Sequence, residues 1–367
     1  MQLLFGKTLY PGKTLLILDE IQSSPNALNL LRFLYELCPA LHVVAAGSLL
    51  DATLSRGGLS LPVGRVEFAY IYPLNFFEYL LAMGETTKLD YLKGLGISDA
   101  KKISEPIHND LNKLFTDYAM VGGMPEVVKI YSETRSLEQV KHIYSSLLTA
   151  FTDDVYKYST LADVRYLSFV IQNAPNFAAR LFRYENFAGS NFRSREVSHA
   201  FELVEKAQIV HQLKATSSTQ LPLIGKSNRP KKLLFLDVGF YNYKADIFSS
   251  YLNRGDLNDM YKGCASEQIV GQNLLSTFVD KQPDLYYWAK ERTRGQAEVD
   301  FCFVSKSHVI GLEVKSGSYG KLASAAVFEK EVSNSKVLRI YSGRFEEERF
   351  TSIPFYLLPR IMEFADS

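Results

Sequence analysis

The sequence has few cysteines, no long apolar run and no excess of charge of either sign. Its three cysteines, Cys38, Cys264 and Cys302, lie in apolar or helical contexts and form no C-x-x-C pair, so neither a disulfide framework nor a zinc site is expected. No apolar run reaches the roughly 18 residues of a membrane-spanning helix, and no signal segment begins the chain. Lysine and arginine total 41 against 40 aspartate and glutamate residues, so no global field demands nucleic acid or membrane. These absences predict a cytoplasmic protein without a membrane partner.

What the sequence does contain is a charged pattern on two apolar runs near its C-terminus. Residues 299–304 and 309–315 are typical of the strands of a hairpin with a polar turn. Asp300 lies near the start of the first strand, and Glu313 and Lys315 lie two residues apart at the end of the second. Because side chains alternate along a strand, Glu313 and Lys315 share one face. Two carboxylates and an ammonium group on one sheet face can hold a divalent cation and a scissile phosphate together.

This D-(x)n-E-x-K pattern resembles the core of the PD-(D/E)xK nucleases. The resemblance implies that Asp300 and Glu313 are Mg²⁺ ligands and that Lys315 positions or activates the attacking water. In that family an acidic residue on the preceding helix often completes the site, and Glu267 matches it here. The same spacing also arises by chance, and a Glu-x-Lys pair on a solvated strand is usually a surface pair. The pattern therefore favours the fold more strongly than the activity.

A second pattern, near the N-terminus, joins an apolar strand to an acidic pair. Residues 15–18 predict a strand buried on both faces of a parallel sheet, and Asp19 and Glu20 follow at its C-terminal edge. This matches a Walker B motif, in which the Asp holds Mg²⁺ and the Glu orients the attacking water of ATP hydrolysis. A helix is predicted over residues 26–37, and a second buried strand ends at Ser48, where AAA-type ATPases carry a sensor of the γ-phosphate. Strand, helix and strand form half of a doubly wound unit.

The phosphate-binding loop that should accompany a Walker B motif is missing from this sequence. Gly-Lys-Thr occurs at Gly6 and at Gly12, but no glycine lies five residues before either of them, as G-x-x-x-x-G-K-[ST] requires. The residues after Thr14 predict a strand rather than a helix whose N-terminus could bind phosphate. The sequence favours a truncated ATPase over one that has lost nucleotide binding, and this polypeptide is not expected to bind ATP with useful affinity.

The middle of the chain is expected to be mainly helical. Residues 84–104 are charged and turn-rich and predict an exposed insertion, and residues 105–158 predict a helical lid. A helix over 195–208 followed by two strands is the order of a winged helix. The loop 225–232 is basic throughout and predicts contact with the phosphates of DNA or RNA. The residues expected to make that contact are Lys226, Arg229, Lys231 and Lys232. The alternative is that the basic loop is simply solvated and the winged helix docks protein.

Taken as a whole, the chain resembles prokaryotic AAA-type ATPases that carry a C-terminal DUF4143 domain. The stretches that carry the resemblance are residues 15–22, 45–50, 62–67, 72–80, 122–128, 236–239 and 298–301. The resemblance and the patterns along the chain together predict an α/β fold in four parts. These are a partial P-loop NTPase core over 1–80, a helical lid over 81–158, a winged-helix domain over 159–247 and a PD-(D/E)xK nuclease-like α/β domain over 248–367.

Two hypotheses about function follow from these patterns. The first is a nucleic-acid-associated ATPase-family protein with a Mg²⁺-dependent nuclease-like C-terminal domain. The second is a regulatory or interaction protein in which both sites are degenerate. The absent phosphate-binding loop favours the second hypothesis, and the complete D…E-x-K set favours the first. Self-association, or pairing with a separate segment that carries the phosphate-binding loop, is compatible with either.

Overall fold

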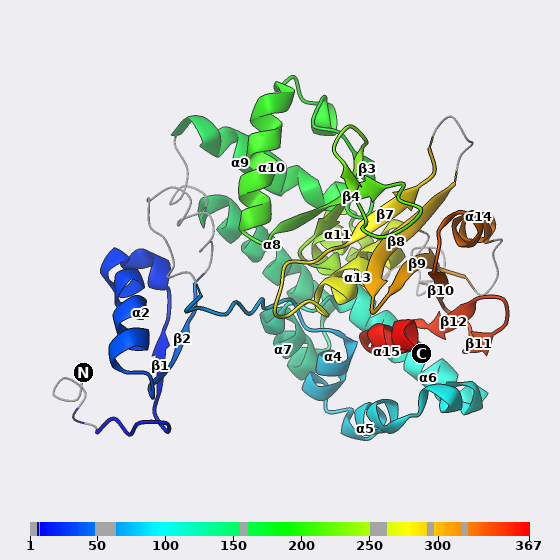
Figure 1. The fold of residues 1–367 in the computed structure, drawn as a ribbon, viewed down its shortest axis with the longest axis horizontal. Coiled ribbons are helices and arrows are strands. Elements are labelled where there is room, and N and C mark those ends of the chain that lie inside the picture. Colours follow the sequence, from blue (N-terminus) through cyan, green and yellow to red (C-terminus); the bar gives the residue numbers. More distant parts are fainter. Residues whose placement is uncertain are drawn as a thin grey trace.

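The N-terminal region is a small α/β unit that lies at one end of the molecule (Figure 1). The computed structural model describes residues 6, 8–47, 64–154, 161–249, 263–291, 297–317 and 322–367. Strands β1 (Leu15–Leu18) and β2 (His42–Ala45) pair in parallel. Between them lies α2 (Pro25–Leu37), whose first turn is capped by Ser24 Oγ, which accepts from the Ala27 amide at 3.3 Å. Strand, helix and strand therefore occur as the sequence predicts.

The two strands of this unit are much less buried than expected. Leu15, Ile17 and Val44 are 52%, 63% and 51% exposed. The expectation of a strand buried on both faces was wrong for β1, because among the described residues its sheet has two strands and helix α2 covers only part of it. An apolar run thus predicted the strand but not its burial.

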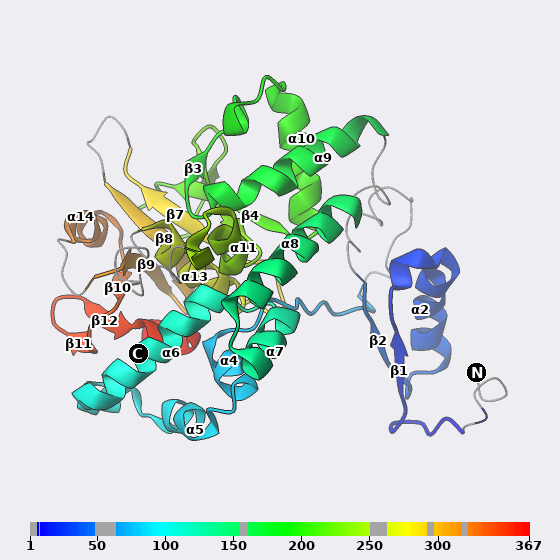
Figure 2. The ribbon, with the colours of Figure 1, turned by 180° about the vertical axis from the view of Figure 1, so that it is seen from behind.

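The helices after this unit build one side of the main body (Figure 2). Residues 84–104 do not form the exposed insertion expected of them, since they fold into two helical segments. Their apolar residues Leu89, Leu92, Ala100 and Ile103 are at most 4% exposed and join the main core. The helices of this part are α4 (Phe76–Ala82), α5 (Thr86–Gly94), η2 (Ile97–Lys102), α6 (Glu105–Val121), α7 (Pro125–Thr134), α8 (Leu137–Asp154) and α9 (Leu161–Asn173).

One mixed sheet runs through the rest of the body. Its order is β11-β12-β10-β9-β8-β7-β4-β6-β3, with β5 paired to β4. Strand β4 pairs in parallel with β7, so the sheet crosses the expected boundary at residue 248. In this respect the structure differs from the expectation of a separate C-terminal α/β domain. The strands are β3 (Leu181–Phe182), β4 (Val210–Thr216), β5 (Gly225–Lys226), β6 (Lys231–Phe235), β7 (Tyr286–Ala289), β8 (Glu298–Ser305), β9 (His308–Lys315), β10 (Ser335–Tyr341), β11 (Glu346–Glu347) and β12 (Thr351–Pro354).

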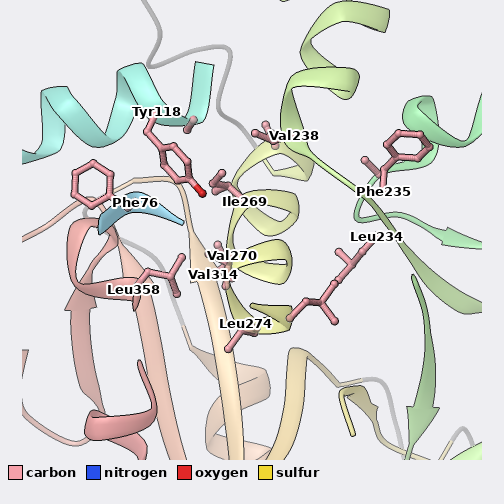
Figure 3. Packing of buried hydrophobic residues seen from close by; sticks show 14 of the residues in the cluster. Phe76, Tyr118, Leu234, Phe235, Val238, Ile269, Val270, Leu274, Val314 and Leu358 are labelled. Carbon is pink, nitrogen blue, oxygen red and sulfur yellow. The ribbon is translucent and has the colours of Figure 1, made fainter. Parts of the chain in front are cut away.

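A helix in the middle of the body, α13 (Cys264–Leu275), organises the core. Every residue from Gln268 to Leu275 is buried, and Figure 3 shows α13 between β6, which carries Leu234, and β9, which carries Val314. The Gln268 side chain caps the end of β6 by accepting from the Phe235 amide and donating to the Phe235 carbonyl. The other helices here are α10 (Ser194–Lys206), α11 (Val238–Lys244), α14 (Ala323–Glu331) and α15 (Ile361–Asp366). Within the described residues, no helix has both the length and the apolar content needed to cross a bilayer.

Candidate functional site

Hairpin β8–β9 forms as the sequence predicts and sets the C-terminal candidate site. The strands are antiparallel, with Phe301 opposite Leu312, so Asp300 lies close to the end of β9. The Asp300 carboxylate accepts a hydrogen bond from the Val314 amide at 2.8 Å. On the same strand, Lys315 Nζ donates to Glu313 Oε2 at 2.9 Å. The hairpin therefore brings the predicted Asp, Glu and Lys into one cluster.

The fourth predicted residue, Glu267, enters this cluster from the first turn of α13. Its partner is Lys232 on β6, whose Nζ lies 2.9 Å from Glu267 Oε2. The same Nζ lies 3.5 Å from Asp300 Oδ1 and 3.7 Å from Glu298 Oε1. Lys232 is only 2% exposed. The structure thus gathers residues from β6, α13, β8 and β9 around a buried ammonium group.

Lys232 and Glu298 are the members of this cluster whose place the sequence analysis missed. The sequence places Lys232 both in the basic loop 225–232 and at the start of the second predicted strand. The structure confirms the strand, β6, and the expected exposure to nucleic acid was wrong because the side chain is buried. No local signal marks Lys232, since its partners lie 35 and 68 residues away. Glu298 could have been found, because it lies two residues before Asp300 on the same strand and alternation places both on one face.

Burial and mutual charge govern the protonation of the cluster. Burial raises the pKa of Glu267 to about 7, against the opposing attraction of the Lys232 ammonium. Burial likewise raises the pKa of Glu313. For Lys232 burial acts to lower the pKa, but the Asp300 and Glu267 carboxylates outweigh it and the pKa is raised. The pKa of Lys315 is raised in the same way, mainly by Glu313. Both lysines therefore stay charged near neutral pH.

The donor set suits a divalent cation in kind and in charge. Carboxylate oxygens are the ligands that Mg²⁺ prefers. Four carboxylates (Glu267, Glu298, Asp300 and Glu313) face two ammonium groups (Lys232 and Lys315), so the cluster is two negative charges in excess when all six ionise. As the side chains lie, no three acidic, histidine or cysteine residues of the described chain form a group that could hold a metal ion. The Lys232 ammonium lies where three of the carboxylates meet.

The cluster is open to solvent on one side. The side chains of Glu298 and Lys315 are 39% and 33% exposed, whereas those of Asp300 and Glu313 are 16% and 5% exposed. A ligand arriving from solvent would meet Lys315 and Glu298 first. The partly exposed Lys315 ammonium group therefore lies beside carboxylates that are more deeply buried.

The predicted Walker B residues lie in the N-terminal region, at the end of β1. Glu20 has a left-handed backbone with φ 50°, and its amide donates to Asp19 Oδ1 at 3.0 Å. Its carboxylate accepts from Gln22 Nε2 at 2.6 Å. Ser48, the predicted sensor, lies outside the described residues. The acidic pair therefore sits at the strand end where the sequence placed it, and its role in binding Mg²⁺ and ATP stays a prediction.

The other basic residues predicted to contact nucleic acid have partners within the body. Lys226 pairs with Glu291, and Arg229 donates to the carbonyl oxygens of Ala289 and Lys290 at 3.2 and 3.0 Å. The Lys231 ammonium lies 4.7 Å from the centre of the Tyr184 ring. The side chain of Lys226 is 34% exposed and that of Arg229 is 13% exposed. Their contact with nucleic acid stays a prediction.

A buried carboxylate, Asp237, connects the helical part of the body to α13. Its oxygens accept from the Gly123 amide at 2.7 Å, Gln272 Nε2 at 2.9 Å, the Tyr144 hydroxyl at 2.7 Å and the Gly239 amide at 2.8 Å. Burial raises its pKa despite these hydrogen bonds. In the sequence, residues 122–128 and 236–239 carry only the family resemblance. The structure joins the two stretches through this one side chain.

Three family models match successive parts of the chain. An AAA domain model matches residues 1–80, and a domain of unknown function, DUF4143, matches residues 262–358. The chain therefore contains an N-terminal region similar to an AAA domain and a C-terminal region similar to DUF4143. A second domain of unknown function, DUF8612, matches residues 112–251. No match was found among curated proteins or among solved structures.

The DUF8612 match covers a part of the chain for which the sequence patterns predict a different division. It spans the boundary expected at residue 159 between a helical lid and a winged helix. Helices α6 to α10 and strands β3, β4 and β6 all lie wholly or largely within it. The helix, strand and strand order of α10, β4 and β6 is present, and its assignment as a winged helix stays a prediction.

Proposed function

We propose that this ATPase-family protein acts on nucleic acid through a metal-dependent, nuclease-like site in its DUF4143 domain. The observation that carries the proposal is the meeting of Asp300, Glu313 and Lys315 with Glu267 in one half-open cluster. These residues come from two strands and a helix, so a shared cluster is not a consequence of sequence proximity. The family resemblance and the geometry support the same set of side chains.

In this proposal Asp300, Glu313 and Glu267 would hold Mg²⁺. The ion would supply an activated water and neutralise charge that develops on the phosphate. Lys315 keeps its proton at Nζ because the pKa of its ammonium group is raised. It therefore acts by attraction and hydrogen bonding to the phosphate or the attacking water, and not as a general base. The partly exposed Lys226 would contribute to backbone binding outside the cluster.

The ATPase part of the proposal concerns the N-terminal region. Asp19 would bind the Mg²⁺ of a bound nucleotide and Glu20 would orient the attacking water, with Ser48 as the sensor, as in P-loop NTPases. The Gln22 side chain donates a hydrogen bond to the Glu20 carboxylate and so fixes its position. The phosphate-binding loop that would complete such a site does not occur in the sequence given, so nucleotide binding is expected only if another segment supplies it.

The proposal is tested by Mn²⁺- and Mg²⁺-dependent cleavage of single- and double-stranded DNA and RNA by the full chain. We expect Lys315→Ala, Asp300→Asn and Glu313→Gln each to lower the cleavage rate by about two orders of magnitude, the scale of losing one preorganised electrostatic group. Lys306→Ala is the control, because Lys306 lies in the turn of the same hairpin and its side chain is 63% exposed. Cleavage that survives Lys315→Ala would come from a contaminant or from another site.

A second function, binding without catalysis, is favoured by one specific observation. The buried Lys232 ammonium already neutralises part of the cluster, as it would in a nuclease fold retained for interaction. If the wild-type chain cuts none of the four nucleic acids and calorimetry detects no Mn²⁺ binding, this second function replaces the first.

A further inference from the structure

Lys232 is the most deeply buried ion in the candidate site, and the metal-dependent function gives it no role. Its side chain is 2% exposed and extends from β6 toward β8, where Nζ also lies 3.3 Å from the Asp300 carbonyl oxygen. The rings of Phe301 and Tyr287 lie 5.5 and 5.8 Å from the ammonium group. Carboxylates and aromatic faces both stabilise a cation. The carboxylates and aromatic rings around Lys232 therefore form a cation-binding site, and the Lys232 ammonium group itself occupies it.

The position of this ammonium conflicts with a metal ion at the same carboxylates. Lys232 Nζ makes contacts of 2.9 Å with Glu267 and 3.5 Å with Asp300, two of the three residues proposed to bind Mg²⁺. A divalent ion bound to both carboxylates would lie a few ångströms from the ammonium, where like charges in a shielded site repel strongly. Each carboxylate oxygen also has few lone pairs to share. The two cations therefore compete for the same carboxylate oxygens.

We propose that Lys232 is an internal counter-ion that competes with a divalent cation for Glu267 and Asp300. This inference rests on the proposed metal-dependent function and concerns its regulation. Without metal, the ammonium neutralises part of the charge on these carboxylates and occupies their oxygens. When metal binds, the Lys232 side chain leaves these carboxylates. Lys232 thereby sets the metal concentration at which the site becomes occupied.

Departure of the ammonium would have a consequence along β6. Lys232 lies in the same strand as Phe235, which the Gln268 side chain holds to α13, and five residues before Asp237. Exchange of Lys232 for a metal would thus change the contact between β6 and α13, which also carries Glu267. Strand β6 therefore connects the candidate site to the helices that are hydrogen-bonded to Asp237.

The first experiment measures Mn²⁺ affinity by calorimetry on the full chain at constant pH and ionic strength. Lys232→Met removes the charge and leaves an unbranched side chain that is one atom shorter. We expect it to bind Mn²⁺ at least about tenfold more tightly than wild type, since a tenfold change corresponds to only about 1.4 kcal/mol. Lys306→Met removes an exposed lysine from the turn of the β8–β9 hairpin and should leave the affinity unchanged. Equal or weaker binding by Lys232→Met, or no binding by either protein, overturns the proposal.

The second experiment needs no substitution at the site and so remains valid if Lys232→Met folds poorly. The wild-type chain is acylated at lysines with and without Mn²⁺, and each lysine is followed by mass spectrometry. We expect Mn²⁺ to increase the acylation rate of Lys232 several-fold, because the buried amine is released from its partners, and to leave Lys306 unchanged. Bound Mn²⁺ with continued protection of Lys232 argues against displacement.

The outcomes separate this inference from the proposed function. Tight Mn²⁺ binding by Lys232→Met without cleavage of any nucleic acid supports the competition and contradicts the nuclease. Metal-dependent cleavage by wild type, with Mn²⁺ affinity unchanged in Lys232→Met, supports the nuclease and contradicts the competition.

Discussion

The strands β1 and β9 reverse the usual relation between polarity and burial. β1 consists of four apolar residues, yet Leu15 and Ile17 are more than half exposed. β9 ends in Glu-Val-Lys, yet Glu313 is 4% exposed. The difference lies in what packs against each strand. β9 has β8 and β10 beside it and α13 over one face, whereas β1 has one neighbouring strand among the described residues. Burial is decided by tertiary partners, and polarity decides only whether those partners must include an opposite charge.

The largest expected contrast between the two regions concerns glycines with a left-handed backbone. Gly122 in the body has φ 84°, and a Cβ there would lie 2.1 Å from Asp237 Oδ1 and 2.2 Å from the Tyr144 hydroxyl. Gly12, near β1, has φ 71° and nothing within 4 Å of an added Cβ. Gly122→Ala should lower the free energy of unfolding by about 5 kcal/mol, because it breaks a buried hydrogen-bond network. Gly12→Ala should cost only about 1 kcal/mol of backbone strain.

Two probes read this contrast separately. The single tryptophan, Trp288, is 1% exposed on β7, so its fluorescence in urea follows the body, and amide hydrogen exchange follows β1 and β2. Equal losses for the two glycine variants would mean that the Asp237 network can move aside, and the body would then be less rigid than its packing indicates.

A smaller contrast is expected for isoleucines in the two kinds of strand. Ile310 on β9 is fully buried, and Ile17 on β1 is 63% exposed. Ile310→Ala should cost about 3 to 4 kcal/mol through lost transfer energy and a cavity, and Ile17→Ala less than about 0.5 kcal/mol. The measurement is urea unfolding followed by far-ultraviolet circular dichroism. A loss above about 2 kcal/mol for Ile17→Ala would show that another part of the chain, or a second copy, covers β1 in solution.

Local patterns allowed the strands and their pairing to be predicted where neighbours in sequence are neighbours in space. The hairpin predicted at 299–304 and 309–315 forms as β8 and β9, and the helix predicted over 195–208 is α10. Prediction failed where burial depends on distant residues. Residues 84–104 have many charges, and only the packed structure shows that Leu92 is fully buried.

The candidate site shows the same division. Asp300, Glu313 and Lys315 were found because alternation and spacing on one hairpin place them together. Lys232 could not be found, because its sequence neighbours Lys231 and Arg229 are partly exposed and make a basic stretch that is typical of a surface. Its burial depends on a charge match with Glu267 and Asp300 across the fold. A sequence pattern does not encode such a match locally.

The smallest contrast concerns pH and the histidines of the two regions. His211 on β4 is 9% exposed, and burial lowers its pKa from 6.5 to about 4. The unfolded chain therefore binds one more proton than the folded chain between these pH values. The contribution of neutral His211 to the free energy of unfolding is fully present above pH 6.5 and is lost as the pH falls toward 4. At pH 4.5, about two units below the unfolded pKa, the loss should be about 2 to 3 kcal/mol, since each pKa unit corresponds to about 1.4 kcal/mol. His211→Phe should remove this part of the pH dependence, and His42→Phe at an exposed position of β2 should not.

The test is urea unfolding between pH 4.5 and 7.5, followed by Trp288 fluorescence. The quantity compared is the difference in the free energy of unfolding between wild type and each variant. This difference cancels the opposite contribution of Asp237, whose raised pKa favours the folded state at low pH. If wild type and His211→Phe have parallel profiles, His211 accepts its proton within the folded sheet, and β4 opens more readily than its burial indicates.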